Sequence, residues 1–265
     1  MLKKLITLIC HPSFIGLYFL DKVSTILLWI SCFFVFTTGL LATKDLIKPR
    51  FTHQTSIAIS DVFLQNENLK TTTYSNHLLN GSKETIECED VTIIVNESAY
   101  VNNNLDFKLI LVFSQSEANA YYAGMNLGKV KYDDINIKDF SIQEIRDSKS
   151  VILRSDLESF ITSFLNNVEM NYRSVIFFLD FRDILVFYLL TLLVCFIASV
   201  IRNPRIEGKI RRRLIAYDSI IYFVFIWFEL FFEVYWLSYV GVCFAVLYTI
   251  LTFSRIKMIS YKREG

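Results

Sequence analysis

The stretch that decides the fold is Ser219–Phe253, SIIYFVFIWFELFFEVYWLSYVGVCFAVLYTILTF, in which only Glu229 and Glu233 are charged. A single helix of this length would measure about 52 Å, whereas the hydrocarbon core of a bilayer is roughly 30 Å thick. Two helices of about 17 residues each, joined by a tight turn near Phe232–Trp236, fit a membrane better. Neither Gly nor Pro marks this turn, so the sequence leaves its position open.

Two further apolar stretches are long enough to cross a bilayer. Val23–Thr43 and Ile184–Ile201 contain no charged residue, and charged residues flank both of them. Together with the C-terminal block they account for much of the 53% hydrophobic content, which is too high and too concentrated for an ordinary soluble domain. The net charge of +1 provides no field that would attract nucleic acid, so we expect no nucleic-acid partner.

The distribution of basic residues predicts the topology, because cytoplasmic loops carry an excess of Lys and Arg. Basic residues gather before the first span, between the second span and the C-terminal block, and in the tail. Four spans place all three groups in the cytoplasm, whereas three spans would leave the basic tail outside. We therefore predict four spans in the cell membrane with both termini in the cytoplasm. The three groups are Lys3, Lys4 and Lys22; Arg202, Arg205, Lys209, Arg211, Arg212 and Arg213; and Arg255, Lys257, Lys262 and Arg263.

The N-terminus raises two questions: whether the first span is retained, and what structure the segment before it has. A retained anchor is favoured over a cleaved signal peptide, because 22 residues precede the first span and Leu40–Ala42 is a poor cleavage site. Leu2–Ile9 has apolar residues at helical spacing beside two lysines and is interrupted by Pro12. This segment is either a short helix on the inner leaflet or a frayed beginning of the first span.

The region between the first two spans is rich in Asn, Thr, Ser and Asp and has the size of one domain. Short β-type runs predict strands at Ile57–Leu64, Thr85–Asn96, Phe107–Phe113 and Lys129–Ile137, with a hairpin at Gly124–Gly128. Ser155 and Glu158 fit a capping box that would begin a helix. The helix continues towards the second span, and an apolar stripe along it should pack on the sheet: Leu157, Phe160, Ile161, Phe164, Leu165 and Val168.

These observations predict a membrane protein with four transmembrane α-helices and an extracytoplasmic α+β domain inserted between spans one and two. Of the five cysteines only Cys88 falls in the extracytoplasmic region, so no disulfide within the chain is expected there. The expected segments are an N-terminal segment 1–22, a first span 23–43, an extracytoplasmic domain 44–175, a second span 176–202, a basic loop 203–216, a third and fourth span 217–254, and a tail 255–265.

Several short fragments carry a resemblance to a known family. They include Ser60–Phe63 followed by Glu67–Leu69, Leu111–Phe113 leading to Lys131–Asp133, and Arg213–Tyr217 at the entry to the third span. With this layout of spans, the chain resembles a Gram-positive (Firmicute) family of multi-pass membrane proteins of unknown function, domain of unknown function 1189, some of whose members are labelled maltodextrin-utilisation proteins. The resemblance implies location and architecture, and association with a sugar-uptake transporter, but no chemistry. The Pro expected early in the third span is missing here.

The acidic pair Glu229 and Glu233 is the sharpest candidate site. The two residues are four positions apart and therefore share a helix face, and ionisable residues at membrane depth are usually functional. Such a pair could bind a cation, relay a proton or accept an Arg from a partner helix. The alternative is that both carboxylates face water at the outer end of the third span. Asp180, Arg182 and Asp183 are either an interfacial cluster of ion pairs or the polar border of the second span.

The basic group Arg205, Lys209, Arg211, Arg212 and Arg213 is a second candidate, because it could contact anionic lipid headgroups or a cytoplasmic partner. Its alternative role is topology alone. Motifs for nucleotide, zinc-hydrolase or serine-hydrolase chemistry are absent from the sequence, and we expect no enzyme activity, cofactor or metal. The sequence thus favours an accessory subunit of an envelope or transport complex that binds other membrane proteins. The alternatives are a small oligomeric transporter or channel component that uses the acidic pair, and an envelope enzyme.

Overall fold

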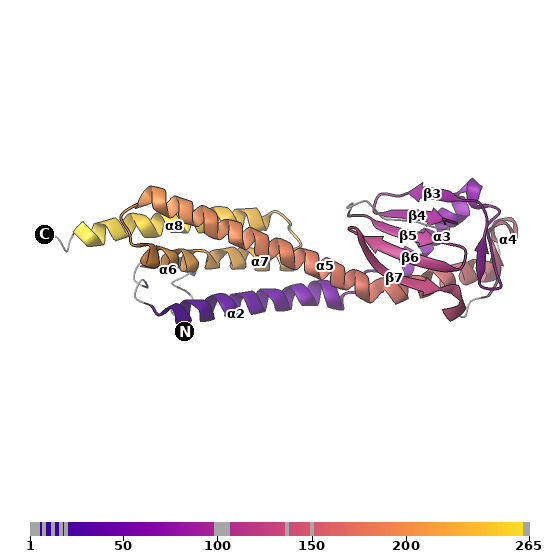
Figure 1. Ribbon diagram of the computed structural model, residues 1–265, viewed down its shortest axis with the longest axis horizontal. Coiled ribbons are helices and arrows are strands. Elements are labelled where there is room, and N and C mark those ends of the chain that lie inside the picture. The colour runs from indigo at the N-terminus through magenta and orange to yellow at the C-terminus, as the bar shows by residue number, and fades with distance from the viewer. Residues whose placement is uncertain are drawn as a thin grey trace. The chain divides into compact units, whose positions relative to one another are not determined.

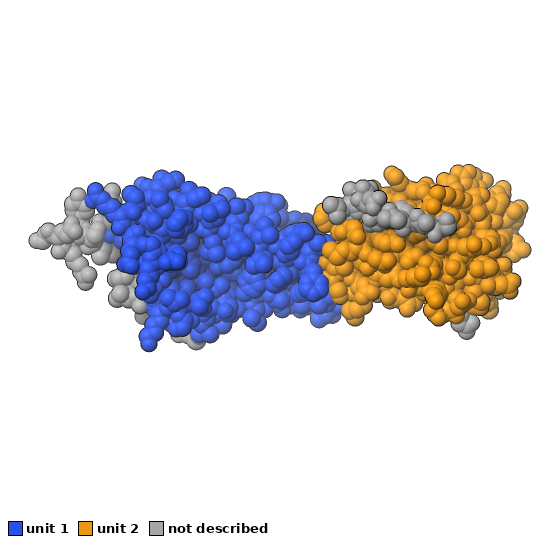
Figure 2. Space-filling model, viewed as in Figure 1, with its two compact units in different colours: residues 1–47, 177–265 blue, residues 48–176 orange. Residues whose placement is uncertain are grey.

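The computed structural model describes residues 6, 9–11, 14–15, 18, 21–97, 107–135, 138–148 and 151–261, with side chains up to 256. The chain forms two compact units, shown in different colours in Figure 2. The membrane unit comprises residues 1–47 and 177–265, and the αβ unit comprises residues 48–176. The predicted helix over Leu2–Ile9 and the lysines of the tail lie largely outside the described residues.

The described residues include four helices that are long and apolar enough to cross a membrane: Val23–Ile47, Val151–Arg202, Gly208–Phe232 and Leu237–Ile256. The first consists of α2 (Val23–Ala42) and a π-helical turn, Thr43–Ile47. The third consists of α6 (Gly208–Asp218) and α7 (Ile220–Phe232), and α8 (Leu237–Tyr261) follows. The second, α5 (Val151–Arg202), has 52 residues, of which 177–202 belong to the membrane unit.

The basic segment 203–216, expected as a loop, is largely helical because α6 begins at Gly208. Leu214 and Ile215 of α6 are buried in the bundle. The third helix therefore packs against its neighbours along part of the basic segment as well. Figure 1 shows α2, α6, α7, α8 and the second half of α5 running side by side.

Helix α7 is the central helix of the membrane unit. In the most apolar part of the helix Gly208–Phe232, which contains α7, 56% of the residues are buried inside the protein. The corresponding share in the other three candidate spans is 22 to 33%. The rings of Phe33 and Trp227 stack at 5.1 Å, and the Trp227 indole N–H donates to Thr37 Oγ1 at 2.8 Å. Tyr188 of α5 packs on Phe223 at 4.8 Å. Aromatic side chains therefore fill the centre of the bundle, while the outer faces of α2, α5 and α8 remain apolar and exposed, as lipid contact requires.

The described residues of the αβ unit form two sheets. A five-stranded sheet has the order β3-β4-β5-β6-β7, and a three-stranded sheet has the order β2-β1-β8. All neighbouring strands are antiparallel except β4 and β5, which pair in parallel with Ile93 opposite Leu111. The strands are β1 (Thr73–Ser75), β2 (Leu78–Asn80), β3 (Glu84–Glu87), β4 (Val91–Val95), β5 (Leu109–Phe113), β6 (Glu117–Tyr122), β7 (Met125–Lys131) and β8 (Phe140–Ser141).

The core of the αβ unit lies where one face of the large sheet meets α3 (His53–Gln65), α4 (Ile142–Ser148) and the first half of α5 (Figure 1). All six residues of the apolar stripe expected on α5 are at most 1% exposed. Phe160 is the centre of an aromatic cluster, with its ring 5.3 Å from Tyr74 and from Tyr132. The stripe therefore packs on the sheet, as the spacing predicts.

Several local predictions in this unit are wrong. Thr85–Asn96 contains two strands, β3 and β4, instead of one, and the strand predicted at Lys129–Ile137 is β7, which ends at Lys131. Ile57–Leu64 is not a strand but part of α3, whose buried residues Ser56, Ile59, Ser60 and Phe63 follow helical rather than alternating spacing. The capping box at Ser155 does not form, because α5 begins four residues earlier and the Ser155 hydroxyl donates to the Ile152 carbonyl at 2.7 Å. Glu158 instead accepts from Arg154 Nε at 3.0 Å, and Arg154 also pairs with Asp61 of α3 at 2.7 Å.

Candidate functional site

The acidic pair is divided by the end of α7. Glu229 lies within the helix and is half-buried. Its Oε2 accepts a hydrogen bond from the backbone N–H of Ser238 at 2.7 Å, so it satisfies one of the free N–H groups at the beginning of α8. Glu233 ends α7 in the left-handed region, with φ 56° and ψ 36°, and is exposed. The turn between Phe232 and Leu237 therefore sends the two carboxylates to different surroundings.

Glu229 lines a cavity of about 220 Å³ at the end of the bundle where α7 turns into α8. We call it the turn-end pocket. Its polar wall combines charged side chains of three helices with tyrosines, and apolar residues form the rest. The lining is Leu41, Lys44, Asp180, Asp183, Ile184, Phe187, Tyr222, Ile226, Glu229, Leu230, Tyr235, Ser238 and Tyr239.

The charges of the turn-end pocket are unbalanced. One ammonium and three carboxylates line it, which gives a formal charge of −2. Lys44 Nζ pairs with Asp180 Oδ2 at 3.3 Å and lies 5.9 Å from the centre of the Tyr235 ring. Asp183 pairs with Arg182, which is not part of the lining, at 2.8 Å. A cavity with excess carboxylates and aromatic walls suits a cationic group, such as an amine, a metal cation or a Lys or Arg of a partner.

The sequence pointed to Glu229 but not to this pocket. In the sequence, Asp180 and Asp183 indicate either an interfacial cluster of ion pairs or the border of the second span, and Lys44 is a charge that flanks the first span. Tertiary packing brings together residues that lie 136 positions apart, and no periodicity within one segment encodes that contact. The charges that flank the first two spans were the available signal, because helices that pack side by side bring such ends together.

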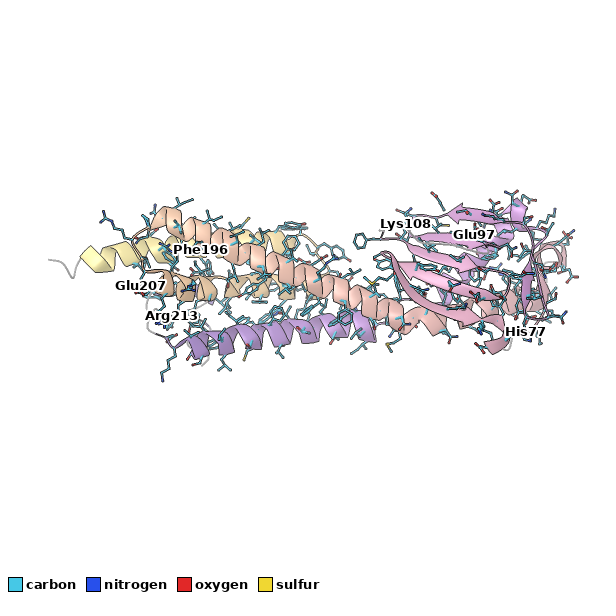
Figure 3. All side chains as sticks on the ribbon, in the orientation of Figure 1. His77, Glu97, Lys108, Phe196, Glu207 and Arg213 are labelled. Carbon is cyan, nitrogen blue, oxygen red and sulfur yellow. The ribbon has the colours of Figure 1, made fainter. Side chains whose placement is uncertain are left out.

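The basic group at the other end of the membrane unit is not a uniform charged surface. Arg205, Lys209 and Arg212 are exposed and Arg213 is half-buried. Figure 3 labels Arg213 and Glu207 in the membrane unit. Arg211 is only 7% exposed; its Nη2 donates to the Asn203 carbonyl at 2.8 Å and the Pro204 carbonyl at 3.3 Å.

Arg211 therefore stabilises the fold at this end of the membrane unit. Its guanidinium satisfies carbonyl groups that follow the C-terminus of α5, where cations are favoured, and lies 5.8 Å from the Phe196 ring. The residues that remain available for lipid headgroups or a partner are the exposed Arg205, Lys209 and Arg212.

Comparisons with protein-family models, with curated proteins and with solved structures found no match for this chain. The site must therefore be interpreted from its own geometry.

Proposed function

We propose that the chain is a non-enzymatic multi-pass protein of the cell membrane that presents residues 48–176 outside the cytoplasm as a binding and assembly domain. In this proposal both termini are cytoplasmic, and the chain is an accessory subunit of an envelope or transport complex. The observation that carries the proposal is that each unit has a hydrophobic core of its own. A chain whose spans served only as a transport path would not need a separate core outside them.

Two further observations support the placement. The turn between α7 and α8 carries Tyr235 and Trp236, which are 72% and 62% exposed, and such residues favour the membrane–water interface. The opposite end of the bundle carries the exposed basic residues, as expected of a cytoplasmic face. The sequence resemblance adds a sugar-uptake transporter as the class of partner to test first.

Co-purification tests the accessory function. The full-length protein, extracted in a mild detergent through a C-terminal tag, is expected to retain another membrane protein in stoichiometric amount. Reconstituted alone in liposomes, it is expected to move no solute. Recovery only as a homo-oligomer that transports a solute by itself would overturn the proposal.

The turn-end pocket favours a second candidate, a small oligomeric transporter or channel component. A half-buried carboxylate within a span, in a cavity of net negative charge, is a feature of cation pathways. The pair of variants Glu229→Gln and Glu233→Gln separates the candidates, because only Glu229 lines the pocket.

If the protein carries a cation, Glu229→Gln should reduce cation uptake into proteoliposomes at least tenfold, while Glu233→Gln should leave uptake within twofold of the wild type. In Glu229→Gln the amide oxygen can still accept the hydrogen bond from the Ser238 N–H, so the fold should be retained. A thermal melt in detergent checks that both variants are folded. Equal effects of the two substitutions would rule out the pocket as the pathway.

A further inference from the structure

A buried carboxyl group lies in the third span, away from the turn-end pocket. Asp218 is the last residue of α6, and Ser219 separates α6 from α7. Both residues are 0% exposed. Asp218 and Glu229 are eleven positions apart, which corresponds to about 16 Å along a helix, so the two carboxyls belong to different sites.

The surroundings of Asp218 are hydroxyl and thiol groups of α8 and α5. The Thr252 hydroxyl donates to Asp218 Oδ1 at 2.8 Å. Thr249 of α8 and Cys195 of α5, both fully buried, face the same carboxyl group. Asp218 Oδ2 is buried and has no hydrogen-bond partner among the described residues.

No positive charge neutralises this carboxyl within the described part of the chain. None of the ion pairs among the described residues includes Asp218. The side chains of Thr249, Thr252 and Cys195, which face it, are not positively charged. An ionised carboxylate that is buried without a counter-charge is strongly unfavourable, and such a group neutralises by binding a proton. An unpartnered Oδ2 is where that proton can reside.

We propose that Asp218 is a proton-binding site of the membrane unit, in which Thr252 holds one carboxyl oxygen and the other oxygen carries the proton. Loss of the proton would place a negative charge between α8 and the junction of α6 with α7. The packing of α8 on the third span would therefore depend on pH, and the protonated form would be the tightly packed one.

The other titratable groups near the junction lie on two sides, on α5 and around Tyr217. Cys195 faces Asp218 from α5, and Tyr188 of α5 contacts the Ser219 hydroxyl at 3.2 Å. On the remaining side, the Tyr217 hydroxyl donates to Asp21 Oδ2. None of these groups is cationic, so none of them supplies a counter-charge for an ionised Asp218.

A hydrophobic carbodiimide tests the proposal, because it adds to a protonated carboxylic acid and rearranges to a stable N-acylurea that retains the whole reagent. The full-length protein in membranes is treated with dicyclohexylcarbodiimide over a range of pH, and peptides are mapped by mass spectrometry. We expect the peptide that contains Asp218 to be modified at neutral pH and less so as pH rises. Asp183, which is 55% exposed and paired with Arg182, should remain unmodified at neutral pH.

Two variants sharpen the assay. Asp218→Asn should abolish modification of that peptide. Thr252→Val removes a donor that stabilises the carboxylate, so half-maximal modification should move to higher pH. The infrared carbonyl band of a protonated carboxylic acid, present in the wild type and missing in Asp218→Asn, gives a readout that does not depend on access of the reagent.

Two results would overturn the proposal. One is an unmodified Asp218 at every pH together with no protonated-carboxyl band assigned to it. The other is protection of Asp218 by NaCl, but not by choline chloride, at constant pH, which would identify a sodium site instead of a proton site.

Discussion

Replacing Phe160 by Ala is expected to destabilise the αβ unit strongly. The Phe160 ring is 1% exposed and contacts rings of both sheets, Phe113 at 5.8 Å and Phe140 at 5.6 Å. Truncating a buried Phe to Ala costs about 3–5 kcal/mol, a large share of the roughly 5–15 kcal/mol that stabilises a typical domain. Limited proteolysis of the full-length protein in detergent should then cleave within residues 48–176 at least tenfold faster than in the wild type.

Phe107→Ala is the matched control for Phe160→Ala. Phe107 also belongs to the αβ unit but is 64% exposed, so its truncation should change the free energy of unfolding by less than about 0.5 kcal/mol. If Phe107→Ala and Phe160→Ala were cleaved at the same rate, Phe160 would not be the centre of the core. Only Phe160→Ala should also lose the co-purifying partner.

Replacing Trp227 by Ala is expected to loosen the packing of α2 on α7. Trp227 stacks on Phe33, contacts Phe36 at 4.7 Å and donates to Thr37, so one side chain provides much of the contact between these helices. Helices in lipid associate through packing and hydrogen bonds rather than through a hydrophobic driving force, and the hydrogen bond alone contributes about 1 kcal/mol. The thermal unfolding midpoint of the detergent-solubilised protein should fall by several degrees.

Trp236→Ala is the control, since Trp236 is 62% exposed at the turn between α7 and α8. Its removal should leave the packing of α2 on α7 and the unfolding midpoint unchanged within error. An equal decrease of the unfolding midpoint in both variants would mean that loss of any Trp destabilises the protein. The contact between Phe33 and Trp227 would then not be what stabilises the packing of α2 on α7.

The sequence predicted well those features that one segment encodes by itself. Long apolar stretches predicted the candidate spans, and the spacing from Leu157 to Val168 predicted the buried face of α5. It failed at α3, where Ile57–Leu64 reads equally as a strand or a helix. The helical spacing of Ile59, Ser60 and Phe63 was present in the sequence, but the buried serines concealed it.

The turn-end pocket and the environment of Asp218 could not be predicted because both depend on tertiary packing. Lys44 meets Asp180 only when α2 and α5 pack together, and Asp218 meets Thr252 only when α8 packs on the third span. Asp218 directly precedes the apolar block, where it reads as a border charge. The extension of the third helix back to Gly208 places it inside the span instead.

Site-specific labelling with a membrane-impermeant maleimide tests the central claim, that residues 48–176 lie outside the cytoplasm, most directly. Cys88 is partly exposed in the αβ unit, and Glu89→Cys in a Cys88→Ser background supplies an exposed alternative. Lys209→Cys, in the same background, reports on the basic end of the membrane unit. We predict labelling of position 89 in intact cells and of position 209 only after lysis. Labelling of position 209 in intact cells, or protection of position 89 until lysis, would contradict the account.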